Sequence, residues 1–305
     1  QNNSPDGNNN GAKLIESTST STHSIIIGSG TVSNTETFSV FAKKGDRNWI
    51  ALQSGVSYGY FDLENGVKGS IAGSGIQSSK IVSYANNWYK CSITFTRTSN
   101  TNNFIYLSTG DFGANYTGNG TSFVYIWGAS LEQGSYSTSY IPTSGSTVTR
   151  VQDQYEKTGI SNLINSEEGV LFGEIAALSN DGTNRVLSLS SGATTNVVRF
   201  YYSTVDNRLV GNVKSGGATS FSYNHTISNS EDFIKVAVKY KVNDFALWVN
   251  GVEVATDTSG NAPVGLDRLV FDNGAGNDKF FGKVKQLQVF KTALTDTELA
   301  TLTTI

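Results

Sequence analysis

The feature that most constrains this chain is a short alternation of residues between two faces, which recurs along its length with no sustained helical period beside it. The alternation is clear in Ser92–Thr96 and again in Val124–Trp127. A period of two indicates a strand with one face buried. Turn-forming Gly, Asn, Ser and Asp fill the spacers between such runs. Many short strands separated by turn residues predict a β-sandwich.

The strand-like runs form two successive sets, separated near residues 142–165. Within the second set, Asn250-Gly251 is the dipeptide favoured in a two-residue hairpin turn of type I′. The runs of the first set are 23–27, 37–43, 49–52, 57–63, 88–97, 104–108 and 122–132, and the clearest of the second set are 168–178, 185–191, 196–203, 207–215, 233–241 and 245–256. Two sets predict two sandwiches.

A single helix is predicted, at the C-terminal end. Thr295 and Glu298 have the spacing of a capping box, in which each side chain bonds the other residue's backbone N–H. The predicted fold class is therefore all-β, with two tandem antiparallel β-sandwich domains of the jelly-roll, concanavalin A-like kind and one short C-terminal helix. We predict a polar lead-in over 1–12, a first sandwich over 13–145, a linker over 146–164 and a second sandwich over 165–305.

Composition excludes several functional classes. The net charge is −3 without a block of like charges, which argues against nucleic-acid binding. No apolar run approaches 18 residues, so we expect no membrane insertion. The single Cys91 excludes an intrachain disulfide and a cysteine-based zinc site. The chain contains no Met, even at position 1, so we expect a processed product or a fragment.

The sequence shows no carboxylate or histidine residues at the spacing of a known catalytic motif. Some jelly-roll glycoside hydrolases carry alternating carboxylates on one strand, whereas Glu174 and Glu253 are each alone on theirs. The two histidines, His23 and His225, have no paired partner motif for a nucleophilic triad. We therefore predict no catalytic residue and no enzyme.

Five aromatic residues are candidates for sugar binding, because an aromatic ring stacks on the apolar face of a pyranose. They follow charged turns, alternate along strands or sit beside polar residues, and they are Trp49, Tyr58, Tyr201, Tyr202 and Tyr223. Tyr201 and Tyr202 are adjacent, so one of the two should face outward from a strand. The alternative interpretation is that all five are ordinary aromatic residues at strand edges. Trp88, Trp127 and Trp248 are expected in the core.

Calcium is the candidate cofactor; no other is predicted. The run FDNGAGND places four oxygen-bearing side chains after a strand, namely Asp272, Asn273, Asn277 and Asp278. Calcium takes carboxylate and amide oxygens as ligands. The alternative is a turn rich in Asx hydrogen bonds. A weaker candidate of the same kind is Asn180, Asp181 and Asn184.

Two resemblances add to this interpretation. The stretches FALWVNGVEVAT (245–256) and GKVKQLQVFKTALTDTELATL (282–302) resemble the concanavalin-A-like, laminin-G-like jelly roll, which covers about residues 165–305. The stretches ETFSVFAKKGD, NNWYKCSITFT and YTGNGTSFVYIWGASLEQGSYSTSYIPTSGSTVTR, in that order, resemble a β-sandwich module of bacteriophage tail and fibre proteins. Ser130 stands where that module usually has Gln.

What the resemblances imply is a non-catalytic virion surface or tail-fibre protein. Its lectin-like domains would recognise host surface glycans outside the cell. Its partners would be other virion proteins and further copies of itself, as in the homotrimers usual for phage fibres. Two alternatives stay open. One is a purely structural fibre, decoration or adaptor protein, and the other is a secreted bacterial polysaccharide-binding module or glycan-active enzyme.

Overall fold

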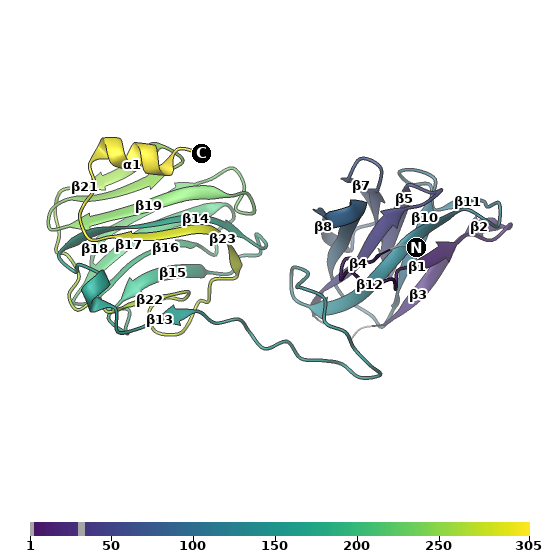
Figure 1. Ribbon diagram of the computed structural model, residues 1–305, viewed down its shortest axis with the longest axis horizontal. Helices are drawn as coiled ribbons and strands as arrows, with labels where there is room; N and C mark the ends of the chain where they lie inside the picture. The colour runs from purple at the N-terminus through teal and green to yellow at the C-terminus, as the bar shows by residue number, and fades with distance from the viewer. Residues whose placement is uncertain (1–2, 30–33) are drawn as a thin grey trace. The chain divides into compact units, whose positions relative to one another are not determined.

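The computed structural model describes residues 3–29 and 34–305, and it divides the chain into two compact units, Gln1–Thr149 and Arg150–Ile305 (Figure 1). Both units are built from antiparallel sheets, so the predicted all-β fold class of tandem β-sandwiches is confirmed. Within the described residues, no helix has the length and apolar character needed to cross a membrane.

The first unit packs two five-stranded sheets face to face. One has the order β1-β12-β4-β9-β8 and the other the order β3-β10-β5-β6-β7, while β11 and β2 form a separate two-stranded ribbon. The strands are β1 (Ala12–Ile15), β2 (Thr20–Thr22), β3 (Ser24–Ser29), β4 (Thr35–Lys44), β5 (Trp49–Ser54), β6 (Ser57–Asp62), β7 (Val67–Ala72), β8 (Ile76–Tyr84), β9 (Trp88–Thr96), β10 (Asn102–Ser108), β11 (Asn115–Thr117) and β12 (Phe123–Gln133), with a 3-10 turn at Ala85–Asn87.

The core of the first unit follows the period of two. Phe38, Val40 and Ala42 of β4 face Ile50 and Leu52 of β5 from the opposite sheet, and all five are fully buried. Because successive side chains alternate between the faces of a strand, the residues between them point away from this core. These outward residues form the outer faces of the two sheets.

The second unit is a sandwich of a six-stranded and a five-stranded sheet. Their orders are β13-β22-β15-β16-β17-β18 and β21-β20-β19-β14-β23. The strands are β13 (Glu156–Lys157), β14 (Glu168–Ala177), β15 (Arg185–Ser190), β16 (Val197–Tyr202), β17 (Arg208–Ser215), β18 (Ala218–Thr226), β19 (Ile234–Lys241), β20 (Phe245–Val249), β21 (Val252–Asp257), β22 (Arg268–Val270) and β23 (Gly282–Phe290), with a 3-10 turn at Ser161–Leu163.

The predicted helix is present as α1 (Asp296–Thr303), and it lies along the outer side of the five-stranded sheet (Figure 1). Both hydrogen bonds of the capping box form between Thr295 and Glu298. Leu299 enters a cluster with Phe172 and Trp248, which confirms that Trp248 is buried. The predicted hairpin turn is also present, with positive φ at Asn250 (50°) and Gly251 (83°), as type I′ requires.

The sandwiches extend further along the chain than the sequence predicted. In the lead-in, Ser4 is 1% exposed, and the carbonyl of Asn3 accepts a hydrogen bond of 2.8 Å from Trp88 Nε1. In the predicted linker, Glu156 and Lys157 pair with β22, and Ile160 belongs to the core of the second unit. A polar composition conceals such pairing because backbone hydrogen bonds do not depend on side-chain polarity.

The expectation that Trp127 lies in the core is wrong. Val124 and Ile126 point inward from β12, so Trp127 points outward, beside Phe41 at 5.3 Å between ring centroids. The chain that follows β12 returns over this outer face and places Tyr140 4.5 Å from Trp127. We call residues 134–140 the strap.

Backbone groups anchor the strap to the sheet beneath it. The carbonyl of Gly134 accepts from Thr37 Oγ1 at 2.9 Å, and that of Ser135 accepts from Thr94 Oγ1 at 3.2 Å. The carbonyl of Thr138 accepts from Lys90 Nζ. The strap therefore covers the outer face of one sheet of the first unit with the chain's own residues.

Candidate functional site

The outer face of the other sheet of the first unit carries aromatic side chains at alternate positions of three adjacent strands. Since Ile50 and Leu52 of β5 point into the core, Trp49, Ala51 and Gln53 point outward. The same alternation turns Tyr58 and Tyr60 of β6 and Phe104 and Tyr106 of β10 outward. With Phe112 from the loop after β10, six aromatic residues share this surface: Trp49, Tyr58, Tyr60, Phe104, Tyr106 and Phe112. We call these six the aromatic face.

Strand register brings the rings together. Tyr106 and Tyr60 both lie opposite Ala51, and Phe104 and Tyr58 both lie opposite Gln53. The small Ala51 leaves room above β5 for rings from the flanking strands. Tyr58 lies 5.5 Å from Tyr106 and 6.1 Å from Tyr60 between centroids, with the Tyr58 and Tyr60 planes only 20° apart.

The aromatic face has a buried base and an accessible upper layer. Tyr60 and Tyr106 are buried, whereas Trp49, Tyr58 and Phe104 are partly exposed. Phe112 is 60% exposed and lies 5.4 Å from Tyr60. The sheet's other side already covers the core, so these rings are not needed to close the sandwich.

Polar groups accompany the rings. Tyr106 donates its hydroxyl hydrogen to Gln53 Oε1 at 2.5 Å, and Gln53 Nε2 donates to the carbonyl of Gly55 at 2.7 Å. Burial, with smaller contributions from Tyr58, raises the pKa of Tyr106 to about 12, so this hydroxyl stays protonated and donates at neutral pH. The Gln53 amide is thereby held in one orientation.

Asp111 forms the rim of the aromatic face beside β7. Its carboxylate accepts from the Ser70 backbone N–H at 2.9 Å and from Ser70 Oγ at 2.8 Å. A Cβ atom at Gly69 would lie 2.7 Å from both Asp111 Oδ1 and Trp49 Cζ3. Gly69 therefore allows the Asp111 loop and Trp49 to approach the β7 backbone.

The predicted sugar-binding residues fall into different places. Trp49 and Tyr58 lie together on the aromatic face, whereas Tyr201, Tyr202 and Tyr223 belong to the second unit. Four further members of the aromatic face were not among the predicted ligand residues: Tyr60, Phe104, Tyr106 and Phe112. For the three strand residues the signal was the alternation itself, because SYGYFD and NNFIYLS place aromatic residues at the positions that alternate with the core-facing ones. Phe112 lies in a loop and had no such signal.

The inclusion of Tyr202 as a ligand residue is wrong. Its side chain is 3% exposed and packs in the core, and its hydroxyl donates to the carbonyl of Ile175 at 3.2 Å. Tyr201 points to the opposite, outer face of the same sheet. Tyr223 is 41% exposed on the edge strand β18 and lies opposite Gly211. A Cβ atom at Gly211 would point toward Leu247 of the other sheet, so Tyr223 is on the inner side. Tyr201 and Tyr223 are therefore on opposite sides of the sheet.

The candidate calcium residues form a loop that bonds to itself. Asp272 Oδ1 accepts from the backbone N–H groups of Gly274 and Gly276, and Asp272 Oδ2 lies 3.1 Å from Lys279 Nζ. Asn273 Oδ1 accepts from the N–H groups of Ala275 and Asn277, and its Nδ2 donates to Asp278 Oδ2. These are the contacts of the Asx-turn alternative. Calcium binding here stays a prediction.

Glu16 and His23, two buried ionisable residues of the first unit, both form hydrogen bonds. Glu16 bonds Arg47 at 2.7 Å and Tyr116 at 2.8 Å, and the Arg47 guanidinium, with help from the Asn119 N–H, lowers the pKa of Glu16 to about 2 against the effect of burial. His23 Nδ1 accepts from the Ser17 N–H at 3.1 Å. Among the described residues, no group of three or more His, Cys, Asp or Glu side chains could hold a metal ion.

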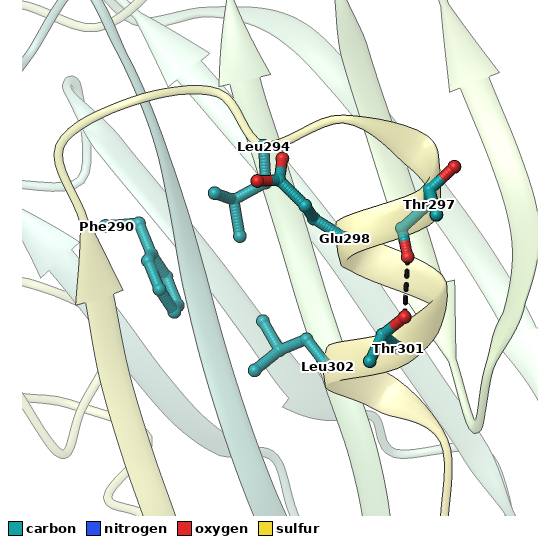
Figure 2. A pocket seen from close by; sticks show the side chains of 6 residues that line it. All are labelled: Phe290, Leu294, Thr297, Glu298, Thr301 and Leu302. Carbon is teal, nitrogen blue, oxygen red and sulfur yellow. Dashed lines mark hydrogen bonds between the residues drawn. The ribbon is translucent and has the colours of Figure 1, made fainter.

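A hollow of about 380 Å³ lies in the second unit, between β23 and α1 (Figure 2). Its lining is mainly apolar, with Phe290 on one side and Leu294 and Leu302 on the other. Its single carboxylate, Glu298, accepts hydrogen bonds from Thr295 in the capping box. This hollow contains none of the predicted site residues.

Among known proteins, the chain is similar to solved structures. No protein-family model and no curated protein matches it. A carbohydrate-binding module (CBM40) of the Ruminococcus gnavus IT-sialidase is 18% identical, over 49% of this chain and 98% of that one, with a TM-score of 0.39. Sheep galectin-11 is 10% identical, over 46% and 99%, with a TM-score of 0.33. A SAP-like pentraxin of Limulus polyphemus is 14% identical, over 46% and 70%, with a TM-score of 0.34.

Proposed function

We propose that the chain is a non-catalytic saccharide-binding protein and that the aromatic face of the first unit is its binding surface. The observation that carries this proposal is the set of aromatic side chains on the outer face of a sheet whose inner face already covers a complete core. Clustered apolar side chains on a solvent-facing surface are unfavourable unless they serve binding.

The chemistry of the face fits a sugar chain. Trp49, Tyr58 and Phe112 offer ring surface to the apolar faces of pyranoses. The fixed Gln53 amide and the Asp111 carboxylate supply polar partners of the kind that select hydroxyl groups. Because the rings extend over β10, β5 and β6, the ligand is an extended saccharide. The Asp111 carboxylate would repel a negatively charged sugar, so the ligand is a neutral saccharide.

We propose further that the protein acts on a virion surface, as part of a tail fibre that recognises host glycans. The support is the resemblance of residues 36–46, 86–96 and 116–150 to the phage tail and fibre module. Several copies in one fibre would raise the avidity of a weak single site. Adsorption assays test this step: the isolated chain in excess should compete with virions for host cells, and equal adsorption with and without it would contradict the virion role.

The binding proposal is tested with the full chain on a glycan array, followed by titration of the best neutral oligosaccharide. Trp49→Ala and Tyr58→Ala should each weaken binding about tenfold, as expected for loss of about 1.4 kcal/mol of ring contact. Tyr223→Ala removes an exposed ring from the other unit and is the matched control. Unchanged affinity in both first-unit variants, with unfolding temperatures like that of the parent chain, would overturn the proposal.

A further inference from the structure

Arg199 occupies the middle of the outer face of the six-stranded sheet in the second unit. Val198 and Phe200, its neighbours on β16, point into the core, so Arg199 and Tyr201 point outward. Both side chains are partly exposed. Their strand lies between β15 and β17, so this position is in the interior of the sheet and away from its edges.

The guanidinium group of Arg199 is held in place. Its Nε donates to Asn212 Oδ1 at 2.9 Å across the β16–β17 pair. Asn212 is itself 4% exposed and donates from Nδ2 to the carbonyl of Phe221 at 3.1 Å. The guanidinium carbon also lies 5.4 Å from the centre of the Tyr201 ring. These contacts engage Nε and leave the two terminal nitrogens for another partner.

Arg199 has no carboxylate partner among the described residues, in contrast to the buried or half-buried arginines of the chain that form ion pairs. Arg47, Arg97 and Arg185 each lie 2.7 Å from a carboxylate oxygen. No described carboxylate lies within 4.0 Å of the Arg199 nitrogens. Burial lowers its pKa, although the charges of Tyr201 and Asp278 oppose the effect. A partly dehydrated cation without an anion is unfavourable, and a bound anion would relieve it.

A second cation shares this surface. Lys214 of β17 lies two residues beyond Asn212 on the same face, opposite Val197, and is therefore a diagonal neighbour of Arg199. Lys214 makes no ion pair with a described residue. Ser222 and Asn224 of β18 continue the same face with exposed hydroxyl and amide groups.

We propose that this outer face binds an acidic saccharide. The terminal nitrogens of Arg199 take a sugar carboxylate in a bidentate pair, Lys214 adds charge beside it, and Asn224 and the Tyr201 ring contact the sugar. A planar guanidinium matches a planar carboxylate with two parallel hydrogen bonds, which is why the carboxylate is favoured over other anions. This site lies in the second unit and does not depend on the aromatic face.

The test is calorimetric titration of the full chain with a trigalacturonate, with its methyl ester as the neutral match and a sulfated trisaccharide as the competing anion. The trigalacturonate should bind with an affinity that falls as salt rises, and the ester should bind at least tenfold more weakly. Arg199→Gln should lower trigalacturonate affinity at least tenfold. Arg199→Lys should lower it too, because the charge stays but the bidentate geometry is lost.

The control variants separate this site from other effects. Lys285→Gln removes one positive charge from the other sheet of the same unit and should leave binding unchanged. Trp49→Ala should also leave it unchanged, so failure of the aromatic-face proposal would be seen separately. The proposal is overturned if the trigalacturonate does not bind, if ester and acid bind equally, if only the sulfated sugar binds, or if Arg199→Gln binds like the parent chain.

Discussion

The rings of Tyr58 and Tyr106 lie 5.5 Å apart although their strands, β6 and β10, do not pair with each other. Strand β5 separates them, and its outward residues between the two rings are Ala51 and Gln53. The small Ala51 leaves room for the two rings, and Gln53 accepts a hydrogen bond from the Tyr106 hydroxyl. The aromatic face therefore depends on the register in which β10, β5 and β6 pair.

The Tyr106–Gln53 hydrogen bond should contribute to stability. Tyr106→Phe leaves the buried Gln53 Oε1 without its donor, and an unsatisfied buried acceptor costs about 1–3 kcal/mol. Urea unfolding followed by tryptophan fluorescence measures the change, because three of the four tryptophans lie in the first unit. Tyr223→Phe, which changes an exposed ring, should leave the midpoint unchanged. Equal midpoints for the two variants would contradict the prediction.

The ion pair of Glu16 with Arg47 should make the first unit sensitive to acid. The pKa of Glu16 is about 2 in the folded chain and 4.5 in its reference state, so the folded state binds a proton less readily than the unfolded one. The resulting stability is present above pH 4.5 and is lost as pH falls toward 2. Unfolding of the parent chain at several pH values should show this loss, and Glu16→Gln should show less of it.

Glu64→Gln is the matched control for that series. Glu64 pairs with Lys44 at 2.5 Å, but the side chains are 48% and 42% exposed, and an exposed ion pair contributes about 0–1 kcal/mol. Its stability profile should follow that of the parent chain. A Glu16→Gln profile identical to the parent's below pH 4.5 would show that this ion pair does not set the acid response.

Helix α1 should be held mainly by Leu299. This residue is fully buried against Phe172 and Trp248, so Leu299→Ala should destabilise the second unit by about 2–5 kcal/mol. Hydrogen exchange of residues 234–249, in β19 and β20 beneath the helix, measures the effect. Thr297→Ala, at an exposed position on the same helix, is the control. Equal protection in both variants would contradict this account.

Tyr140 should stabilise the first unit although it lies after the last strand of the sandwich. Tyr140→Ala removes its contact with Trp127 and should lower the free energy of unfolding by about 1–3 kcal/mol. The same variant should shift the fluorescence of Trp127 to longer wavelength in the folded state. Ser144→Ala, at an exposed position four residues further along the chain, should do neither. A parent-like spectrum for Tyr140→Ala would place the strap elsewhere in solution.

The fold class could be predicted from the sequence because it depends on local patterns. Alternation marked the strands, Asn250-Gly251 marked a turn, and Thr295 with Glu298 marked the helix, and each of these acts over a few residues. The face to which a given aromatic residue belongs could not be predicted in the same way. It depends on which alternate set is inward, as Trp127 shows: its neighbours Val124 and Ile126 are the inward ones.

The candidate site could be predicted only in part for a related reason. Trp49 and Tyr58 stood out by their surroundings, but their assembly with Phe104 and Tyr106 depends on pairing between strands some fifty residues apart in sequence. Arg199 had no signal in the sequence, since its partial burial without a carboxylate partner is a property of the folded chain. Neither long-range register nor a missing countercharge is visible in one sequence.

The strap also determines where the first unit can be joined to another protein. The last strand of the first unit, β12, ends at Gln133. Contacts with the sheet continue beyond it, at Gly134, Ser135, Thr138 and Tyr140. A recombination that joined a foreign partner directly after β12 would strip one outer face and leave Trp127 and Phe41 uncovered. A fusion protein, natural or engineered, should therefore keep the first sandwich together with its strap.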